Sequence, residues 1–156
     1  MRKDEFVMRG QTPSTNNNNT EVLNFSGFKP GYAYKLVEFD IYPSTNIGGS
    51  GGVCEIAATL TASKSAADPL NPNFNDEGLI ATALYFMHSN SPNNGSTESK
   101  TVINDTFLIT QNLILMVEDA GGNDIAVNWQ CKFKPVKMGK AQESVTNYKQ
   151  FTISDD

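Results

Sequence analysis

The segment from Ile125 to Phe133 carries an apolar side chain at every second position, and this alternation constrains the fold more than any other feature of the chain. Its apolar members are Ile125, Val127, Trp129, Cys131 and Phe133. Successive side chains of a β-strand point to opposite faces, so a period of two predicts a strand with one buried face. We expect the strand Ile125–Val136 to be central or near-central in its sheet, with Trp129 buried.

Other stretches have strand-like patterns and are separated by loops rich in Gly, Pro and Asn. They are Tyr32–Tyr42, Val53–Lys64, Leu79–His88, Val102–Thr110 and Asn112–Glu118. Leu79–His88 is apolar on both faces, which fits a strand covered twice, a strand whose second face meets another subunit, or a short helix. Residues 119–123 have the composition of a hairpin turn. Residues 141–153 favour an edge strand over a helix.

About six to eight strands in a chain of 156 residues predict one all-β domain, an antiparallel β-sandwich that is jelly-roll-like. We place this β-sandwich domain at residues 21–156. Residues 1–20 are predicted to form a polar N-terminal arm, because they contain the run Asn16–Asn19 and few apolar side chains. A segment of this composition cannot form a core, so we expect it to order only against another chain.

The composition argues against catalysis and cofactors. The chain has one histidine, His88. Its one stretch with Gly-x-Ser-x-Gly spacing, residues 48–52, is a Gly-rich loop with no helix-forming stretch beside it, so a Ser-His-Asp site is not expected. Its two cysteines, Cys54 and Cys131, lack metal-ligand spacing and are interpreted as buried reduced thiols; one disulfide joining two sheets is the alternative. We therefore predict that the protein is not an enzyme and binds no cofactor or catalytic metal.

Charge and hydropathy limit the partners. The net charge of −5 disfavours binding to a phosphate backbone, and no apolar run is long enough to span a bilayer. We therefore predict no nucleic acid and no membrane as partners.

Two sets of residues are candidates for binding. The predicted interface residues come from the arm and from the segment that is apolar on both faces: Phe6, Val7, Met8, Leu79, Ala81, Ala83, Tyr85 and Met87. The predicted aromatic strip is Tyr32, Tyr34 and Tyr42, which could stack on a sugar or fill a protein interface. Oxygen-rich loops at 71–77 and 119–124 are a possible calcium ligand set, although neither matches a known calcium loop.

The chain resembles the small β-sandwich structural proteins of tailed-bacteriophage virions, including capsid decoration or cement proteins. The resemblance lies in the Asn-rich arm, the segment Tyr32–Tyr42, the strand Ile125–Pro135 and the tail Met138–Tyr148. It implies a virion component that is assembled in the host cytoplasm and decorates or reinforces a capsid. Its partners would be other copies of itself, as a homo-oligomer, and a capsid or shell protein. The alternative function is a carbohydrate-binding β-sandwich module that calcium assists.

Overall fold

The computed structural model describes residues 5–13, 19–25, 31–44, 53–88, 96–120, 124–139 and 146. These residues form eight strands: β1 Phe6–Thr12, β2 Thr20–Leu23, β3 Tyr32–Pro43, β4 Val53–Thr61, β5 Leu79–His88, β6 Ser96–Ile103, β7 Leu113–Asp119 and β8 Val127–Lys137. The predicted tail strand at 141–153 lies outside the described residues, apart from residue 146.

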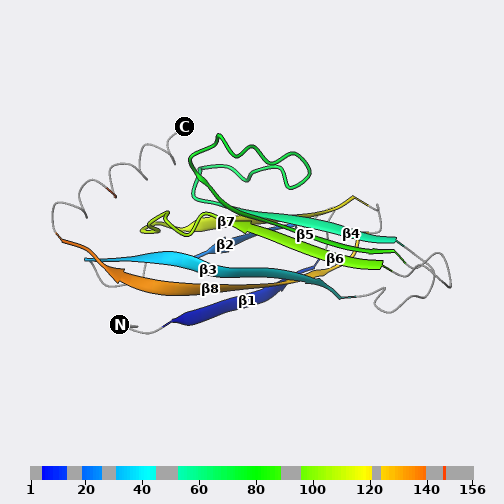
Figure 1. Cartoon of the computed structure of the whole chain (residues 1–156), viewed down its shortest axis with the longest axis horizontal. Coiled ribbons are helices and arrows are strands. Elements are labelled where there is room, and N and C mark those ends of the chain that lie inside the picture. Colours follow the sequence, from blue (N-terminus) through cyan, green and yellow to red (C-terminus); the bar gives the residue numbers. More distant parts are fainter. Residues whose placement is uncertain are drawn as a thin grey trace.

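The strands form two antiparallel sheets that pack face to face (Figure 1). The three-stranded sheet has the order β1-β8-β3, and the five-stranded sheet has the order β2-β7-β4-β5-β6. Within the second sheet, the order β7-β4-β5-β6 is a Greek key, in which a fourth strand returns to lie beside the first. The protein is therefore an antiparallel β-sandwich of the jelly-roll type, as the alternation in the sequence predicts.

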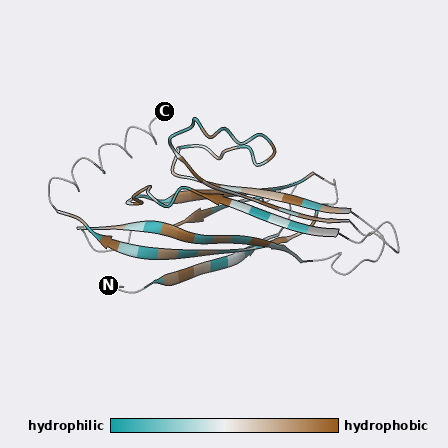
Figure 2. Ribbon diagram, in the orientation of Figure 1, coloured by the Kyte–Doolittle hydropathy of each residue, from teal (hydrophilic) through white to brown (hydrophobic). Residues whose placement is uncertain are grey.

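The alternating side chains of both sheets meet in one core. On β8 the inward side chains are buried and the intervening ones are half-buried or exposed. Figure 2 shows the hydropathy of the residues along the strands of both sheets. Four rings from four segments gather at one place: Phe6 stacks on Phe133 with ring centroids 5.5 Å apart, and Tyr34 and Phe25 lie 5.4 Å and 5.0 Å from these two rings, respectively. Such clusters stabilise the sandwich beyond simple area burial.

The predictions for two segments are confirmed. β8 is the middle strand of its sheet, and Trp129 on it is 9% exposed. Leu79–His88 is a strand, not a helix, and it lies between β4 and β6. Both cysteines are free and buried, Cys131 facing the core from β8 and Cys54 from β4.

The expectation that the N-terminal segment orders only against another chain is wrong for β1. Residues 6–12 pair along their whole length with β8 of the same chain, and Phe6 is 5% exposed in the core. Phe6 in the core, Met8 packed against it and the antiparallel pairing with β8 together place this segment in the sheet. β2, which begins at Thr20, pairs with β7 in the other sheet. Residues 14–18 lie outside the described residues.

Two other predictions need correction. The strand expected at 102–110 is β6, which begins at Ser96 and ends at Ile103. The first half of β6 therefore lies in a polar stretch whose composition predicts a loop. β7 and β8 do not form a hairpin around residues 119–123, because they belong to different sheets. The composition of this segment therefore did not predict which strands pair, because pairing is decided by the whole sandwich.

Candidate interaction surfaces

The loop between β4 and β5 lies on the outer side of the five-stranded sheet (Figure 1). Two threonines of β4 fix it there: the hydroxyl of Thr59 donates a hydrogen bond to the carbonyl of Ala67 at 2.6 Å, and that of Thr61 to the carbonyl of Gly78 at 3.0 Å. Both threonines are fully buried although they face away from the core. The loop is therefore a fixed part of the surface.

Within this loop, side-chain oxygens accept hydrogen bonds from backbone N–H groups two residues further on. Asp68 accepts from Leu70, Asn73 from Asn75 and Asp76 from Gly78, each at 3.0 Å. This is the local turn chemistry of Asx residues. The described residues contain no group of three or more His, Cys, Asp or Glu placed to hold a metal ion. The oxygen-rich sequence at 71–77 thus acts in turn formation, and residue 123 of the second candidate loop lies outside the described part.

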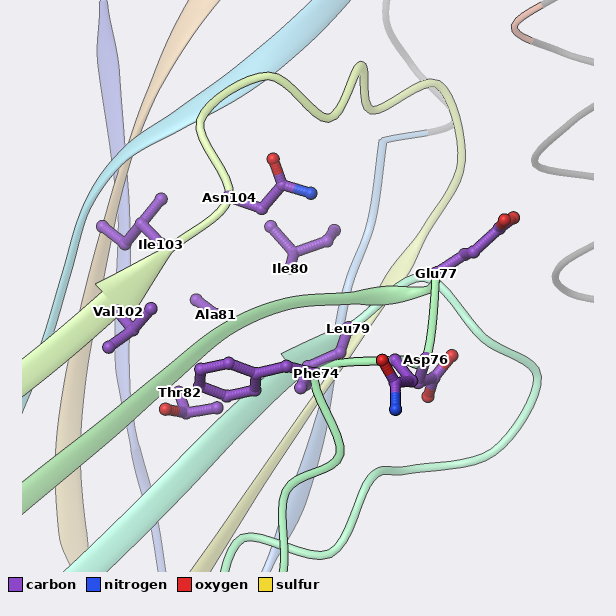
Figure 3. A pocket seen from close by; sticks show the side chains of 11 residues that line it. Phe74, Asp76, Glu77, Leu79, Ile80, Ala81, Thr82, Val102, Ile103 and Asn104 are labelled. Carbon is purple, nitrogen blue, oxygen red and sulfur yellow. The ribbon is translucent and has the colours of Figure 1, made fainter.

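A cleft of about 250 Å³ opens between this loop and the strands β5 and β6 (Figure 3). The ring of Phe74 comes from the loop and lies beside Thr82 of β5, with Val102 of β6 on the neighbouring strand. Phe74 is 64% exposed and Val102 is 42% exposed. The carboxylates of Asp76 and Glu77 stand at the loop side of the cleft.

Leu84 extends this apolar area along β5. Thr82 pairs with Val102 in the antiparallel register, and Leu84 is the next outward residue of β5, 45% exposed. We call Phe74, Leu84 and Val102 the outer apolar patch. Three large exposed apolar side chains, on neighbouring positions of two paired strands and on a fixed loop beside them, are the kind of surface that marks a binding site.

The predicted interface residues of β5 are not among the exposed side chains of this patch, although Leu79 and Ala81 line the cleft beside it (Figure 3). Ala81, Ala83, Tyr85 and Met87 face the other sheet and belong to the chain's own core, and Leu79 is also buried. The sequence shows that β5 is apolar on both faces but does not show which face points outward. Leu84, which the prediction left out, is the exposed one.

The three predicted interface residues of the N-terminal segment also differ in burial. Phe6 is in the core, Met8 packs against the core and is half-buried, and Val7 is 45% exposed on the outer face of β1. An interface role is therefore wrong for Phe6. For Val7 it stays a prediction.

A β-bulge breaks the predicted aromatic strip. The register of β3 with β8 shifts between Leu36 and Glu38, so the residues that face inward change from even to odd numbers at Val37. Tyr34 is therefore 1% exposed in the core, whereas Tyr42, beyond the bulge, is 50% exposed. Tyr32 is half-buried near the other end of the strand. The three rings do not form one strip, because a bulge adds one residue and reverses the alternation.

A second concave surface lies at the free edge of β3. A groove of about 410 Å³ is lined by residues 40–42 of β3, by residues of β5 and β6 that include Tyr85 and Thr101, and by residues 128–130 of β8 with Arg9 of β1. The rings of Tyr42 and Tyr85 are 5.8 Å apart across it. Burial, and then the neighbouring Tyr42 and Cys54, raise the pKa of Tyr85, so its phenol is protonated at neutral pH.

The side chain of His88, at the end of β5, lies outside the described part of the structure. In the described part, no helix has the length and apolar character needed to cross a membrane.

No protein-family model and no curated protein sequence matches this chain. Among solved structures it is similar to VP1, a viral capsid protein, of Trichodysplasia spinulosa-associated polyomavirus, solved in complex with 3'-sialyllactose. The two share 5% identity with a TM-score of 0.43, over 86% of this chain and 94% of VP1.

Proposed function

We propose that the protein is a non-catalytic structural assembly protein that binds other copies of itself and a shell protein through the outer apolar patch. The observation that carries the proposal is the exposure of Phe74 at 64%, next to Leu84 at 45% and Val102 at 42%. Removing this apolar surface from water would favour association, at about 25 cal/mol per Å² buried.

The strands and the loop that carry the outer apolar patch also favour binding. Thr59 and Thr61 fix the loop that carries Phe74, and Leu84 and Val102 are on paired strands. Side chains on a fixed support lose less conformational entropy on binding than side chains on a loose loop. The patch is therefore preorganised for a partner surface.

The finer proposal is that this shell is the capsid of a tailed bacteriophage, which the protein decorates or reinforces in the virion after assembly in the host cytoplasm. Its support is the resemblance of the sequence to small virion proteins, together with the sandwich fold. We assign no catalytic role, since the sequence contains one histidine and its one Gly-x-Ser-x-Gly stretch, residues 48–52, has no helix-forming stretch beside it.

Carbohydrate binding is the alternative function. Of the three tyrosines predicted to bind a sugar, Tyr42 is the one placed to do so, because it is half-exposed beside a groove while Tyr34 is in the core. For the calcium that would assist it, the described residues hold no group of three or more His, Cys, Asp or Glu side chains. A glycan array with and without calcium tests this alternative directly.

The assembly proposal is tested with Phe74→Ser and Leu84→Thr, alone and together. Sedimentation velocity measures self-association, and co-sedimentation with purified phage capsids measures docking. Both should weaken, while the thermal unfolding midpoint changes little because the replaced side chains are exposed. Val22→Thr is the matched control: Val22 is 63% exposed on β2, at the opposite edge of the same sheet. Unchanged self-association and docking of the double variant would contradict the proposal.

A further inference from the structure

The strand order leaves one edge of the sandwich open. In an eight-stranded jelly roll with four strands in each sheet, β6 lies beside β3. Here the pairs β1–β8, β2–β7 and β4–β5 of that arrangement are present, but β6 pairs with β5 as a fifth strand of the other sheet. β3 is consequently an edge strand, and the inward face of β6 extends past it.

The first part of this edge already accepts a chain segment. The N–H of Tyr34 donates to the carbonyl of Ile109 at 3.0 Å, and the N–H of Ile109 donates to the carbonyl of Tyr34 at 2.8 Å. This pair is antiparallel and comes from the segment that follows β6. The edge of β3 is therefore able to form ladder hydrogen bonds, and the bridge sets the direction of a strand that continues it.

The second part of the edge, beyond the bulge, has no such neighbour. The hydroxyl of Thr101 donates to the carbonyl of Phe39 at 3.1 Å, which shows that this carbonyl points away from β8. In an antiparallel ladder the N–H and C=O of every second residue point to the same side, so those of Ile41 also point to the open edge. Among the described residues they have no partner there.

The groove beside this edge has the form that an added strand needs. Residues 40–42 of β3 line it together with Tyr85 of β5 and Ser99 and Thr101 of β6, and residues 128–130 of β8 with Arg9 of β1 complete the lining. An added strand would bond to the backbone of Ile41. Its alternate side chains would lie over the two β6 hydroxyls and the Tyr85 ring, as in other cases of strand addition to a sheet edge.

The charge of the outer face indicates which strand. Glu38 and Asp40 are exposed on β3 next to the edge. Glu38 lies opposite Lys132 of β8, whose ion pair is with Glu5 at 3.3 Å, and Asp40 lies opposite the uncharged Gln130. Directly opposed side chains on neighbouring strands interact, and opposite charges are favourable. We infer that the groove along residues 39–42 accepts an extended segment of a partner protein as an antiparallel strand, with Lys or Arg at the alternate positions that face Glu38 and Asp40. This deepens the proposed assembly function by naming a second contact and the chemistry of its partner.

The test uses the whole protein and a seven-residue peptide of alternating Lys and Val, blocked at both ends. In an NMR titration we expect saturable shifts at the amides of residues 39–42 and slower hydrogen exchange of the Ile41 amide. The matching Glu–Val peptide should not bind. A Lys–Val peptide methylated on alternate backbone nitrogens, so that it cannot donate to β3, should lose binding.

Asp40→Lys should weaken binding of the Lys–Val peptide about fivefold to tenfold, because it replaces an attraction by a repulsion. Glu21→Lys is the matched control: it changes the net charge equally but lies on β2, at an edge of the other sheet, and should leave binding unchanged. Binding that survives backbone methylation, or an unchanged Ile41 amide, would overturn the inference. Displacement of the peptide by a saccharide that binds on a glycan array would also overturn it, because the groove would then be a saccharide-binding site.

The outcome is separable from that of the proposed function. Phe74→Ser is the variant that separates the two: it should leave peptide binding unchanged, because Phe74 does not line this groove, whereas Leu84 does. If Phe74→Ser assembles normally while the peptide still binds, the role of the patch fails and the strand-accepting edge stands. If the peptide does not bind while Phe74→Ser loses assembly, the strand-accepting edge fails and the role of the patch stands.

Discussion

The indole ring of Trp129 on β8 lies against Gly10 of β1, its partner in the antiparallel register. A Cβ atom at position 10 would be 3.0 Å from Cζ2 of the ring, closer than ordinary van der Waals contact. The ring is 9% exposed, and its Nε1 is buried without a hydrogen-bond partner among the described residues. Glycine at the edge strand therefore provides the space that a large ring on the middle strand fills.

Gly10→Ala should lower the free energy of unfolding by about 1–3 kcal/mol, because the added methyl group overpacks the contact with Trp129. Gly139→Ala is the matched control, since a Cβ there meets no atom within 4 Å. Urea denaturation followed by tryptophan fluorescence measures both. Equal stability of the two variants would show that the sheet relaxes around position 10 without cost.

Phe6→Ala should lower the free energy of unfolding by about 3–5 kcal/mol, because it leaves a cavity in the aromatic cluster with Tyr34 and Phe133. Val7→Ala, on the exposed face of the same strand, should change it little. Deleting residues 2–12 should be at least as damaging as Phe6→Ala. A truncated protein as stable as the full chain would restore the view of this segment as an independent arm.

Both thiols should be unreactive in the native protein. Burial, and then the nearby Asp119, raises the pKa of Cys54, and burial with Asp40 raises that of Cys131, so the reactive thiolate is scarce at neutral pH. Iodoacetamide at pH 8 should label neither cysteine of the folded protein and both in denaturant. Thr20→Cys, at an exposed position, is the positive control for labelling. Labelling of the native chain at the rate of this control would contradict the burial.

Stability should fall as the pH rises above the ordinary thiol pKa of 9.0. The folded protein keeps the proton on Cys131 at pH values where the unfolded chain releases it, so unfolding becomes easier with each increase in pH. The fall should approach about 1.4 kcal/mol per pH unit for each such thiol. Urea unfolding of the parent and of Cys131→Ala between pH 8 and pH 10.5 measures it, and the variant should show a smaller slope. The same slope in both would mean that other groups cause the loss.

Period-two alternation was sufficient to predict the sandwich class, the central position of β8 and the burial of Trp129, because the pattern of a half-buried strand is local. The same pattern identified Leu79–His88 as a segment with two apolar faces. It did not tell which face is outward, because that depends on which sheet and which loop cover the strand. In the structure Leu84 is outward and Tyr85 inward, with the loop 62–78 over part of the outer face.

The sequence by itself therefore determined the strands with strong alternation, the single-domain size and the placement of both cysteines among apolar neighbours. Only the tertiary structure decided what each strand pairs with. The polar segment Phe6–Thr12 joins the sheet because β8 offers it an edge and the core offers Phe6 a site. The bulge at Val37 moves Tyr34 inward, and the pairing of β6 with β5 leaves the edge of β3 open. These outcomes depend on contacts between residues far apart in the chain, which no local pattern encodes.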